Sequence, residues 1–317
     1  MNNLTPITSK QNTQSAHVNN DRMRSSREIA ISWTNNFEAN TGGEKNYIKS
    51  GLTALDANLG GWLHQGHLIL IAARPSMGKS ALVQQIAENI SVDSTTIFYT
   101  LEMQGEELAE RSIARRTGIS VKRLKLGEDF DDGEWSLIGK ALGEFADLKL
   151  LIDDYPVYID NIVSKSQKIS EELSANGEKL GLIVVDYAQL VSTIKPAANK
   201  NLEVGAISRA LKRLAMELSV PVVALAQLNR EVEKRNDKRP VMTDLRDSGE
   251  LEQDADTILF LYRDEVYDEH SNDKGIAEIT ASKNRHGELC TTKMAFVGHR
   301  MMFADLAHST SGAEYVY

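Results

Sequence analysis

The chain has 317 residues, enough for one large α/β domain with extensions or for two small domains. Its hydrophobic content of 41% and charged content of 26% are ordinary for a soluble globular protein, and its longest apolar runs are only strand-sized, so no transmembrane span is expected. A net charge of -9 excludes a protein that coats nucleic acid with its whole surface, although a local basic channel remains compatible with it. The single cysteine, Cys290, excludes a disulfide framework and a cysteine metal site, and the polar first residues lack the apolar core of a signal peptide. Both observations predict a cytoplasmic protein.

The N-terminal region divides into a polar segment and a helix. Residues 1–24 are rich in Asn, Ser, Thr and Gln without any period, which predicts disorder. The run Ser25-Ser26-Arg27-Glu28 resembles a capping box that opens a helix ending before Gly42. One face of this helix carries the apolar side chains of Ile29, Ala30, Trp33 and Phe37. Such a stripe must be buried, either on its own domain or on a neighbouring subunit, and the sequence leaves both open.

A phosphate-binding loop follows the first strand of the main domain. Residues 68–72 form an apolar run that predicts a buried strand, and residues 81–90 have helical periodicity. Between them, the pattern G-x-x-x-x-G-K-[ST] is matched by Ala73, in place of the first Gly, and by Arg74, Pro75, Ser76, Met77, Gly78, Lys79 and Ser80. Backbone N–H groups of such a loop converge on phosphates, and the helix dipole adds positive potential. We expect Lys79 to reach the β/γ-phosphates and Ser80 to ligate Mg²⁺.

The remainder of the chain alternates strands and helices, which predicts an α/β fold with a mainly parallel sheet flanked by helices. The last two strands follow each other without a helix and are expected to form an antiparallel edge. Residues 307–317 are predicted to be a short flexible tail. The predicted strands are 67–73, 95–101, 148–153, 181–186, 220–227, 256–262, 275–283 and 291–297, and the predicted helices are 79–90, 105–117, 133–146, 159–175 and 203–219.

Three polar residues end predicted strands and are candidates for the same site. Asp186 follows four apolar residues, as in a Walker B strand that delivers a carboxylate to Mg²⁺ beside the phosphate loop. Glu102 follows the next strand after the loop and suits a general base that orients the attacking water. Gln227 could bond to the γ-phosphate or to that water. Taken alone, Glu102 could equally be a solvated carboxylate and Gln227 a surface amide.

From about residue 50 to 305 the chain resembles the ATPase domain of DnaB-type replicative DNA helicases, which are hexameric rings of RecA-like P-loop NTPase folds. The resemblance rests on several long segments in the right order, and Ala73 is itself typical of this family. These segments are residues 72–80, Leu101-Glu102-Met103, Asp186-Tyr187-Ala188-Gln189-Leu190, residues 221–230, Lys238-Arg239-Pro240, residues 244–256, residues 262–267, and Lys283-Asn284-Arg285-His286-Gly287.

The resemblance implies a role for each matching residue. It makes ATP the nucleotide, with Lys79 and Ser80 binding triphosphate and Mg²⁺, Asp186 supporting the metal and Glu102 acting as the catalytic base. Gln227 couples the γ-phosphate to a DNA-facing loop. Arg285 is an arginine finger inserted into the neighbouring subunit's site, with Lys283 beside it. The loop that grips the single-stranded DNA backbone contains Arg246, Asp247 and Gly249.

The resemblance also implies function and partners. It predicts an ATP-dependent ring helicase that moves 5′ to 3′ on single-stranded DNA as a homohexamer, with a helicase loader as a further partner. The alternative is a RecA-like DNA-dependent ATPase that remodels or loads on DNA without unwinding. The helix that begins near Ser25 corresponds in position to the family's linker helix. The family's N-terminal collar domain binds primase, but only about 24 polar residues precede this helix, which makes a primase partnership doubtful. We expect a disordered segment 1–24, a linker helix and connector 25–49, an ATPase domain 50–306 and a tail 307–317.

Overall fold

The computed structural model describes residues 23, 25–41, 47–127, 129–155, 158–186, 191–193 and 199–306, apart from the side chains at 36, 39–41, 200 and 246–249. The predicted disordered segment 1–24, except Met23, and the predicted tail 307–317 lie outside these residues. Contacts divide the chain into two units, Met1–Glu44 and Lys45–Tyr317. No helix in the described ranges is long and apolar enough to cross a membrane.

The first unit contains helix α1, Ser26–Thr41, whose start is set by a capping box. The Ser25 backbone N–H donates to the Glu28 carboxylate over 2.8 Å, and the Glu28 N–H donates to the Ser25 hydroxyl over 3.3 Å. These bonds satisfy donors that have no partner within the first helical turn. One turn apart, Trp33 and Phe37 stack with ring centroids separated by 5.2 Å, and both are more than half exposed. The predicted apolar stripe therefore exists and is exposed in the single chain.

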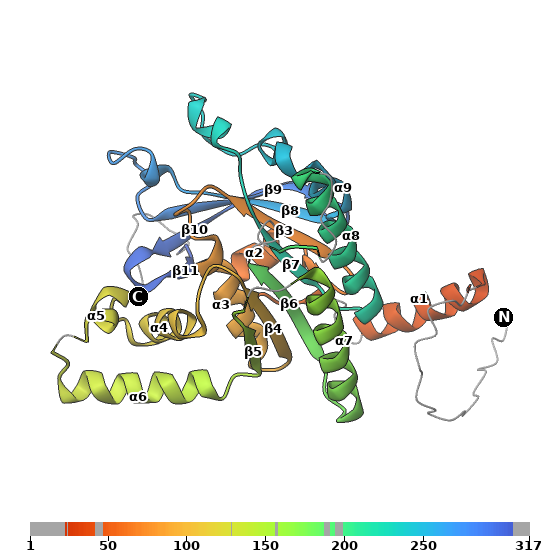
Figure 1. Ribbon diagram of the computed structural model, residues 1–317, viewed down its shortest axis with the longest axis horizontal. Coiled ribbons are helices and arrows are strands. Elements are labelled where there is room, and N and C mark those ends of the chain that lie inside the picture. The colour runs from red at the N-terminus through yellow and green to blue at the C-terminus, as the bar shows by residue number, and fades with distance from the viewer. Residues whose placement is uncertain are drawn as a thin grey trace, which may run out of the picture. The chain divides into compact units, whose positions relative to one another are not determined.

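The second unit is built on a nine-stranded sheet with the order β11-β10-β9-β8-β3-β7-β6-β4-β5 (Figure 1). The strands from β8 to β5 run parallel, because helices connect them across the faces of the sheet. The last three strands of the chain are antiparallel and form the opposite edge. The strands are β3 (Leu68–Ala73), β4 (Thr95–Thr100), β5 (Leu150–Asp153), β6 (Leu180–Asp186), β7 (Val222–Gln227), β8 (Thr257–Tyr262), β9 (Ile276–Asn284), β10 (Thr291–Val297) and β11 (Met302–Asp305).

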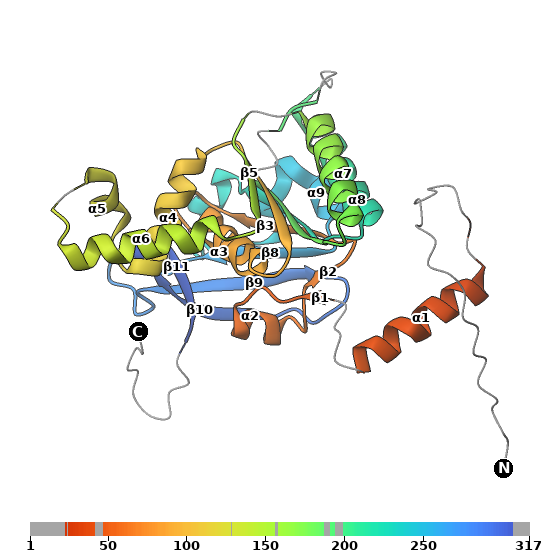
Figure 2. The same ribbon diagram turned by 90° about the horizontal axis from the view of Figure 1, so that it is seen from below.

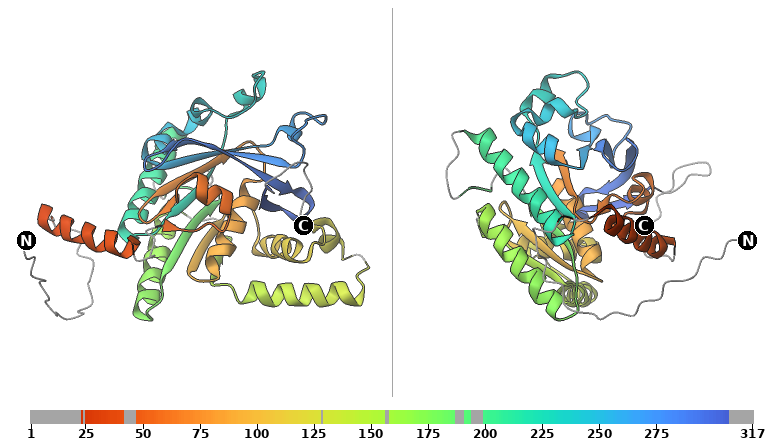
Figure 3. Two further views of the ribbon diagram at one scale, coloured as in Figure 1. Left: turned by 180° about the vertical axis from the view of Figure 1, so that it is seen from behind. Right: turned by 90° about the vertical axis from the view of Figure 1, so that its right-hand side faces the viewer.

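Helices cover both faces of this sheet, so its central strands are buried on both sides. In β3, Leu68 and Leu70 belong to the core beneath α7 and α8, whereas Ile69 and Ile71 belong to the core beneath α2 and α3. Figures 2 and 3 show α7 and α8 side by side on one face. The helices of this unit are α2 (Thr53–Asn58), α3 (Lys79–Ser91), α4 (Gly105–Thr117), α5 (Val121–Leu126), α6 (Asp132–Ala146), α7 (Ile159–Ala175), α8 (Lys200–Leu218) and α9 (Gly249–Asp254).

The predicted α/β fold is confirmed, and each predicted strand and helix of the second unit begins and ends within three residues of the observed one. The sequence reading missed only short elements. Helix α2 and the two-residue strands β1 (Tyr47–Ile48) and β2 (Leu63–His64) are too brief to show a period. Strand β11 follows β10 through a tight turn at Met301, which has a φ of 50°, and it extends the predicted two-stranded antiparallel edge to three strands.

A buried ionic cluster joins α3 to α4, the helix that borders the site described below. Glu88 of α3 is 3% exposed, and its carboxylate accepts from Arg115 over 2.6 Å and from the Ser112 hydroxyl over 2.8 Å. Arg116 pairs with the same carboxylate. Burial raises the pKa of Glu88, but the two guanidinium groups outweigh it and hold that pKa below its ordinary value.

Replacing Glu88 by Gln should destabilise the protein by about 3–5 kcal/mol, because two partly buried guanidinium groups lose their counter-charge. Since folding lowers the pKa of Glu88, its contribution should be complete near neutral pH and should be lost as the pH falls through the folded-state value. Urea unfolding at pH 7 and at pH 4 measures both effects. The control is Lys140→Ala, which removes an exposed pair with Glu144 and should change stability by no more than about 0.5 kcal/mol. Equal losses in the two variants would contradict a special role for the buried cluster.

Candidate nucleotide-binding site

The segment between β3 and α3 has the backbone of a phosphate-binding loop. Gly78 ends it with a φ of 99°, in the left-handed region that favours glycine, and serves as the N-terminal cap of α3. A Cβ at this position would lie only 3.3 Å from Cζ of Phe303, so space as well as conformation calls for glycine. Ser76 also has a positive φ, of 65°. The chain therefore turns sharply into the N-terminus of α3, where free N–H groups and the helix dipole favour an anion.

Two side chains of the loop face the protein and brace it. Arg74 is 7% exposed, and its guanidinium donates to the Leu228 carbonyl over 2.7 Å and to the Glu233 carboxylate over 2.8 Å. Met77 is buried in the core around α3. Of the residues predicted to bind the nucleotide, these two can therefore face a phosphate only with their backbone groups.

A hollow of about 660 Å³ opens at the carboxyl ends of β3, β4 and β7. It brings together residues predicted from separate parts of the sequence, because neighbouring parallel strands place their carboxyl ends at one edge of a sheet. Asp186 ends β6, which lies between β4 and β7. The predicted residues that line the hollow are Pro75, Ser76, Gly78, Lys79, Ser80, Glu102 and Gln227.

Burial shifts the pKa values of the charged groups at and beside this hollow. Asp186 is fully buried, and neither of its carboxylate oxygens has a hydrogen-bond partner among the residues that the structure describes. Burial raises its pKa, while the nearby Ser80 hydroxyl and the Lys79 ammonium lower it. Burial lowers the pKa of Lys79, while Asp186 and Glu102 raise it. A buried carboxylate with unsatisfied oxygens is costly unless a cation comes to it.

This donor set fits a hard divalent cation that is shared with a bound phosphate. Carboxylate and hydroxyl oxygens are ligands that Mg²⁺ accepts, and Mg²⁺ is usually held by one or two protein oxygens together with substrate phosphates. Asp186 and Ser80 supply such oxygens at the loop. Within the described ranges, no group of three or more His, Cys, Asp or Glu residues is arranged to hold a metal ion. The protein groups are therefore suited to Mg²⁺ arriving with a nucleotide.

The sequence reading did not assign a role to Arg263, which the structure places in the same hollow. Its guanidinium donates to the Ser76 carbonyl over 3.1 Å, lies 4.0 Å from the Phe296 ring centroid, and pairs with Glu265. It follows β8, the neighbour of β3 on the side opposite β7. The order of the strands was needed to find it, and the sequence does not give that order.

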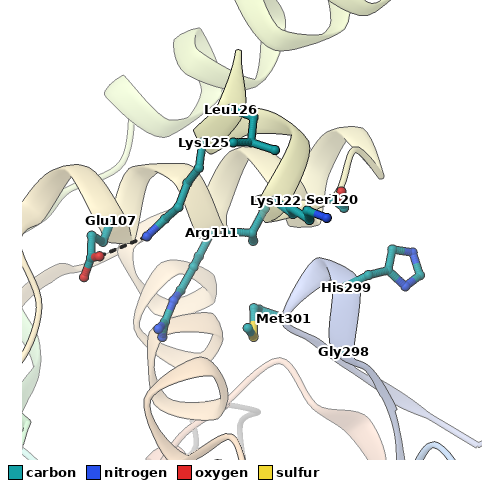
Figure 4. Close-up of a pocket in the computed structure, with 10 residues that line it drawn as sticks. Glu107, Arg111, Ser120, Lys122, Lys125, Leu126, Gly298, His299 and Met301 are labelled. Carbon is teal, nitrogen blue, oxygen red and sulfur yellow. Dashed lines mark hydrogen bonds and ion pairs between the residues drawn. The ribbon is translucent and has the colours of Figure 1, made fainter. Parts of the chain in front are cut away.

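Arg111 is a second cation that the sequence reading missed. It lines both the phosphate hollow and an adjoining hollow of about 580 Å³ between α4, α5 and the turn at 298–301. Figure 4 shows Arg111 extending from α4, with Met301 across from it and with Lys125 reaching Glu107. Burial lowers the pKa of Arg111, and the Glu107 carboxylate raises it. Arg111 lies in α4, the helix that directly follows Glu102, and this nearness in sequence was the signal that could have identified it.

Lys283 and Arg285, in contrast, lie near the amino-terminal ends of the parallel strands, away from the ends that bear the phosphate loop. The last residue of β9 pairs with Thr257, the first residue of β8, and Thr257 pairs with Ile69 near the start of β3. The phosphate loop begins after Ala73, four residues further along β3, which is about 13 Å at 3.3 Å per residue. Neither cation lines the hollow of its own chain.

The segment predicted to grip DNA is helical rather than a loop. Residues 242–248 form a 3₁₀ helix, and Gly249 begins α9. The side chains of Arg246 and Asp247 lie outside the described part of the structure, so the DNA contacts expected of these residues and of Gly249 stay predictions.

The sheet order and the loop-bounded hollow define a P-loop NTPase of the RecA-like class. A model of the family described as "DnaB-like helicase C terminal domain" matches residues 47–305. The chain is 44% identical over 264 residues to "Replicative DNA helicase DnaB" of Pasteurella multocida, an alignment that covers 82% of this chain and 56% of that protein. It therefore belongs to the DnaB-like helicase C-terminal domain family, and it spans little more than half of that relative's length.

Two solved structures share this architecture. One of them, an isolated ATPase domain, superposes with a TM-score of 0.82 at 36% identity, covering 90% of this chain and all of that one. "The Structure Of A DnaB-Like Replicative Helicase And Its Interactions With Primase" superposes with a TM-score of 0.80 at 36% identity, covering 90% of this chain and 68% of that one. At this level of identity the likeness extends beyond the fold to the family.

Replacing Asp186 by Asn should stabilise the protein without nucleotide and weaken its binding of nucleotide with Mg²⁺. The variant removes a buried charge that desolvation penalises more than Ser80 and Lys79 stabilise it, which should raise the free energy of unfolding by about 1 kcal/mol or more. Urea unfolding and titration of a fluorescent nucleotide with and without Mg²⁺ measure the two effects. The control is Asp153→Asn at the end of β5, where the carboxylate pairs with Lys165 over 2.5 Å, and which should not gain stability. An Asp186→Asn protein that keeps full Mg²⁺-dependent affinity would exclude Asp186 as the metal-supporting group.

Proposed function

We propose that this protein is an ATP-driven, ring-forming DNA helicase that moves 5′ to 3′ on single-stranded DNA and separates duplex DNA during replication. The observation that carries the proposal is the phosphate-binding loop with Lys79 and Ser80 lining its hollow and the buried Asp186 carboxylate close to both. Membership of the DnaB-like family and the name of the Pasteurella multocida relative, a replicative DNA helicase, support the same activity. The direction of movement follows from the family resemblance.

ATP is the proposed substrate, with Mg²⁺ as its cofactor. Backbone N–H groups of residues 74–78 and the dipole of α3 face the phosphates, and the Lys79 ammonium balances their charge. Ser80 and Asp186 would hold the Mg²⁺, which when bound draws charge from the phosphate oxygens. Burial lowers the pKa of Lys79, and the nearby Asp186 and Glu102 carboxylates oppose this by favouring the charged ammonium.

Glu102 is the proposed general base for the attacking water. It lines the hollow from the end of β4, is exposed to solvent and faces the same space as Lys79. A carboxylate at this place can accept the proton of a water that attacks the terminal phosphate. Gln227, which lines the hollow from the end of β7, is positioned to contact the same water or the γ-phosphate.

The residues after Gln227 connect the hollow to the proposed DNA segment. The Leu228 N–H donates to the Ala73 carbonyl at the start of the phosphate loop over 3.1 Å, and the Asn229 N–H donates to the Asp244 carbonyl over 3.0 Å. Asp244 lies in the 3₁₀ helix 242–248 that contains Arg246. This short path supports a coupling of nucleotide state to the contacts that Arg246, Asp247 and Gly249 are proposed to make with the DNA backbone.

Arg285 is proposed to complete the site of a neighbouring subunit, with Lys283 beside it. The register of β9 with β8 and of β8 with β3 supports this role, because both cations lie near the amino-terminal ends of the parallel strands, about a strand's length from their own phosphate loop. An arginine supplied in this way stabilises charge on the transferring phosphoryl group. Hydrolysis would then depend on assembly.

Assembly is proposed to be a homohexameric ring in the cytoplasm. Helix α1 would act as a linker helix whose exposed Ile29, Trp33 and Phe37 stripe packs on the next subunit, because an exposed stripe of this size favours a partner. The proposed division of the chain is a linker and connector over 25–49 and an ATPase domain over 50–306. A helicase loader is a proposed further partner.

The unwinding proposal predicts strand separation on a forked DNA substrate with a 5′ single-stranded arm, in the presence of ATP and Mg²⁺. A fluorophore–quencher pair on the duplex measures it. Lys79→Ala should abolish both unwinding and ATP hydrolysis without loss of fold, because Lys79 contacts phosphate rather than the core. Hydrolysis that is stimulated by oligo(dT) without any strand separation would instead favour the alternative, a DNA-dependent ATPase that loads on or remodels DNA.

The shared site predicts complementation between two inactive variants. Arg285→Ala and Glu102→Ala should each lose on the order of 10³-fold or more in hydrolysis rate. Mixed rings should regain activity, because one type of interface then pairs an intact Glu102 with an intact Arg285. Phosphate release measures the rate, and mass photometry must show that subunits exchange. No regained activity in exchanged rings would place Arg285 outside the neighbour's site.

A further inference from the structure

Both cations proposed to act in trans are bound to the end of one short helix in the single chain. The Lys283 ammonium donates to the Glu252 carbonyl over 2.6 Å and to the Gln253 carbonyl over 3.3 Å. The Arg285 guanidinium donates to the Gln253 carbonyl over 2.9 Å through one terminal nitrogen. These carbonyls belong to the last turn of α9, whose free acceptors and negative dipole end favour cations.

Asp256 completes this dock for Arg285. One carboxylate oxygen accepts from the other terminal nitrogen of the Arg285 guanidinium over 3.2 Å, and the Asp256 carbonyl accepts from the Arg285 N–H over 3.0 Å. The second carboxylate oxygen accepts from Lys212 over 2.6 Å and from the Leu68 N–H over 2.8 Å. The Asp256 side chain is 4% exposed, whereas the Arg285 side chain is 46% exposed, so a buried carboxylate holds a guanidinium that still reaches solvent.

The other end of α9 continues the segment proposed to contact DNA. The 3₁₀ helix 242–248 runs directly into Gly249, the first residue of α9. The helix has six residues, which spans about 9 Å at 1.5 Å per residue. At this end Glu250 pairs with Arg209 of α8 over 2.8 Å. The segment proposed to contact DNA is thus joined within two helical turns to the carbonyls that hold Lys283 and Arg285.

We propose that Asp256 and the C-terminal carbonyls of α9 form a latch that holds Arg285 away from the neighbouring subunit's nucleotide until single-stranded DNA engages the preceding segment. The proposal rests on the proposed role of Arg285 and of residues 246–249, and it assigns to Asp256 the part of a positioning residue. Each terminal nitrogen of the guanidinium gives one of its N–H groups to α9 or Asp256, which leaves fewer donors for a phosphate and holds the guanidinium on its own subunit.

The latch predicts a gain of activity when Asp256 is neutralised. Asp256→Asn keeps the side chain's shape and an oxygen for the Leu68 N–H but removes the charge that holds Arg285. Hydrolysis of ATP without DNA should rise by about tenfold, the factor expected for the loss of one charge-assisted hydrogen bond. The rate with saturating oligo(dT) should stay near that of the wild type, so stimulation by DNA should shrink by the same factor.

Two further variants separate this effect from a general disturbance of the buried charges. Lys212→Met removes the other ion pair of Asp256 but leaves the Arg285 contact, so its rate without DNA should not rise. Adding Arg285→Ala to Asp256→Asn should abolish the gain, since the latch acts only through Arg285. A rise in Lys212→Met equal to that in Asp256→Asn, or a gain that persists in the double variant, would overturn the proposal.

The outcomes also distinguish the latch from the role of Arg285 itself. If Arg285→Ala is inactive and a folded, hexameric Asp256→Asn shows no gain, the latch is wrong while the trans role stands. If Arg285→Ala alone hydrolyses ATP at the full rate, the trans role fails and the latch fails with it.

A measurement on the wild-type ring covers the case in which Asp256→Asn does not fold. The Arg285 backbone N–H donates to the Asp256 carbonyl where β9 pairs with β8, so its hydrogen exchange reports how firmly the latch holds this end of β9. With a non-hydrolysable ATP analogue bound, adding oligo(dT) should speed exchange in the peptide 282–287. Unchanged or slower exchange in that peptide would overturn the proposal.

Discussion

The buried charge of Asp186 is the constraint around which the nucleotide-binding half of the molecule is organised. Its carboxylate is fully enclosed at the carboxyl end of β6 and lacks a hydrogen-bond partner within the described part of the chain. Burial raises the pKa of this group, Lys79 in the hollow opposes that shift, and a metal bound together with a phosphate would oppose it further. Asp256, at the other edge of the sheet, is the opposite case: it is equally buried but bound by Lys212, Arg285 and a backbone N–H.

The difference between the surroundings of Asp186 and those of Asp256 follows from the directions of the strands. All parallel strands deliver their carboxyl ends to one edge, so the phosphate loop, Glu102, Asp186 and Gln227 meet there. The antiparallel strand β9 returns to the amino-terminal edge and leaves Arg285 beside Asp256. Within one chain, the phosphate-binding hollow and Arg285, the two halves of the proposed catalytic site, therefore lie about a strand's length apart. A second copy is needed to bring them together, which makes assembly, DNA contact and hydrolysis parts of a single proposed mechanism.

Much of the fold could be predicted because its signals are local. Apolar runs ending in polar residues mark the buried strands, a capping box marks α1, and the Gly-Lys-Ser turn marks the loop. What failed depended on distant parts of the chain. Arg263 lines the hollow because β8 neighbours β3, and Arg111 lines it because α4 lies beside the phosphate loop. Neither neighbour can be read from the periodicity of apolar residues in the sequence. Strand β11 is four residues long and is defined by its pairing with β10. The position of Arg285 beside Asp256 could be predicted only with the register in which β9 pairs with β8.

The central claim is that the phosphate-binding hollow and Arg285 act together only between copies of the chain. Electron microscopy of the protein with a non-hydrolysable ATP analogue and oligo(dT) tests it most directly. The account predicts a ring in which each Arg285 guanidinium lies within hydrogen-bonding distance of the terminal phosphate held by the adjacent subunit's Lys79. A ring in which Arg285 remains on Asp256, with the phosphate approached only by Arg263 and Arg111 of its own subunit, would contradict it.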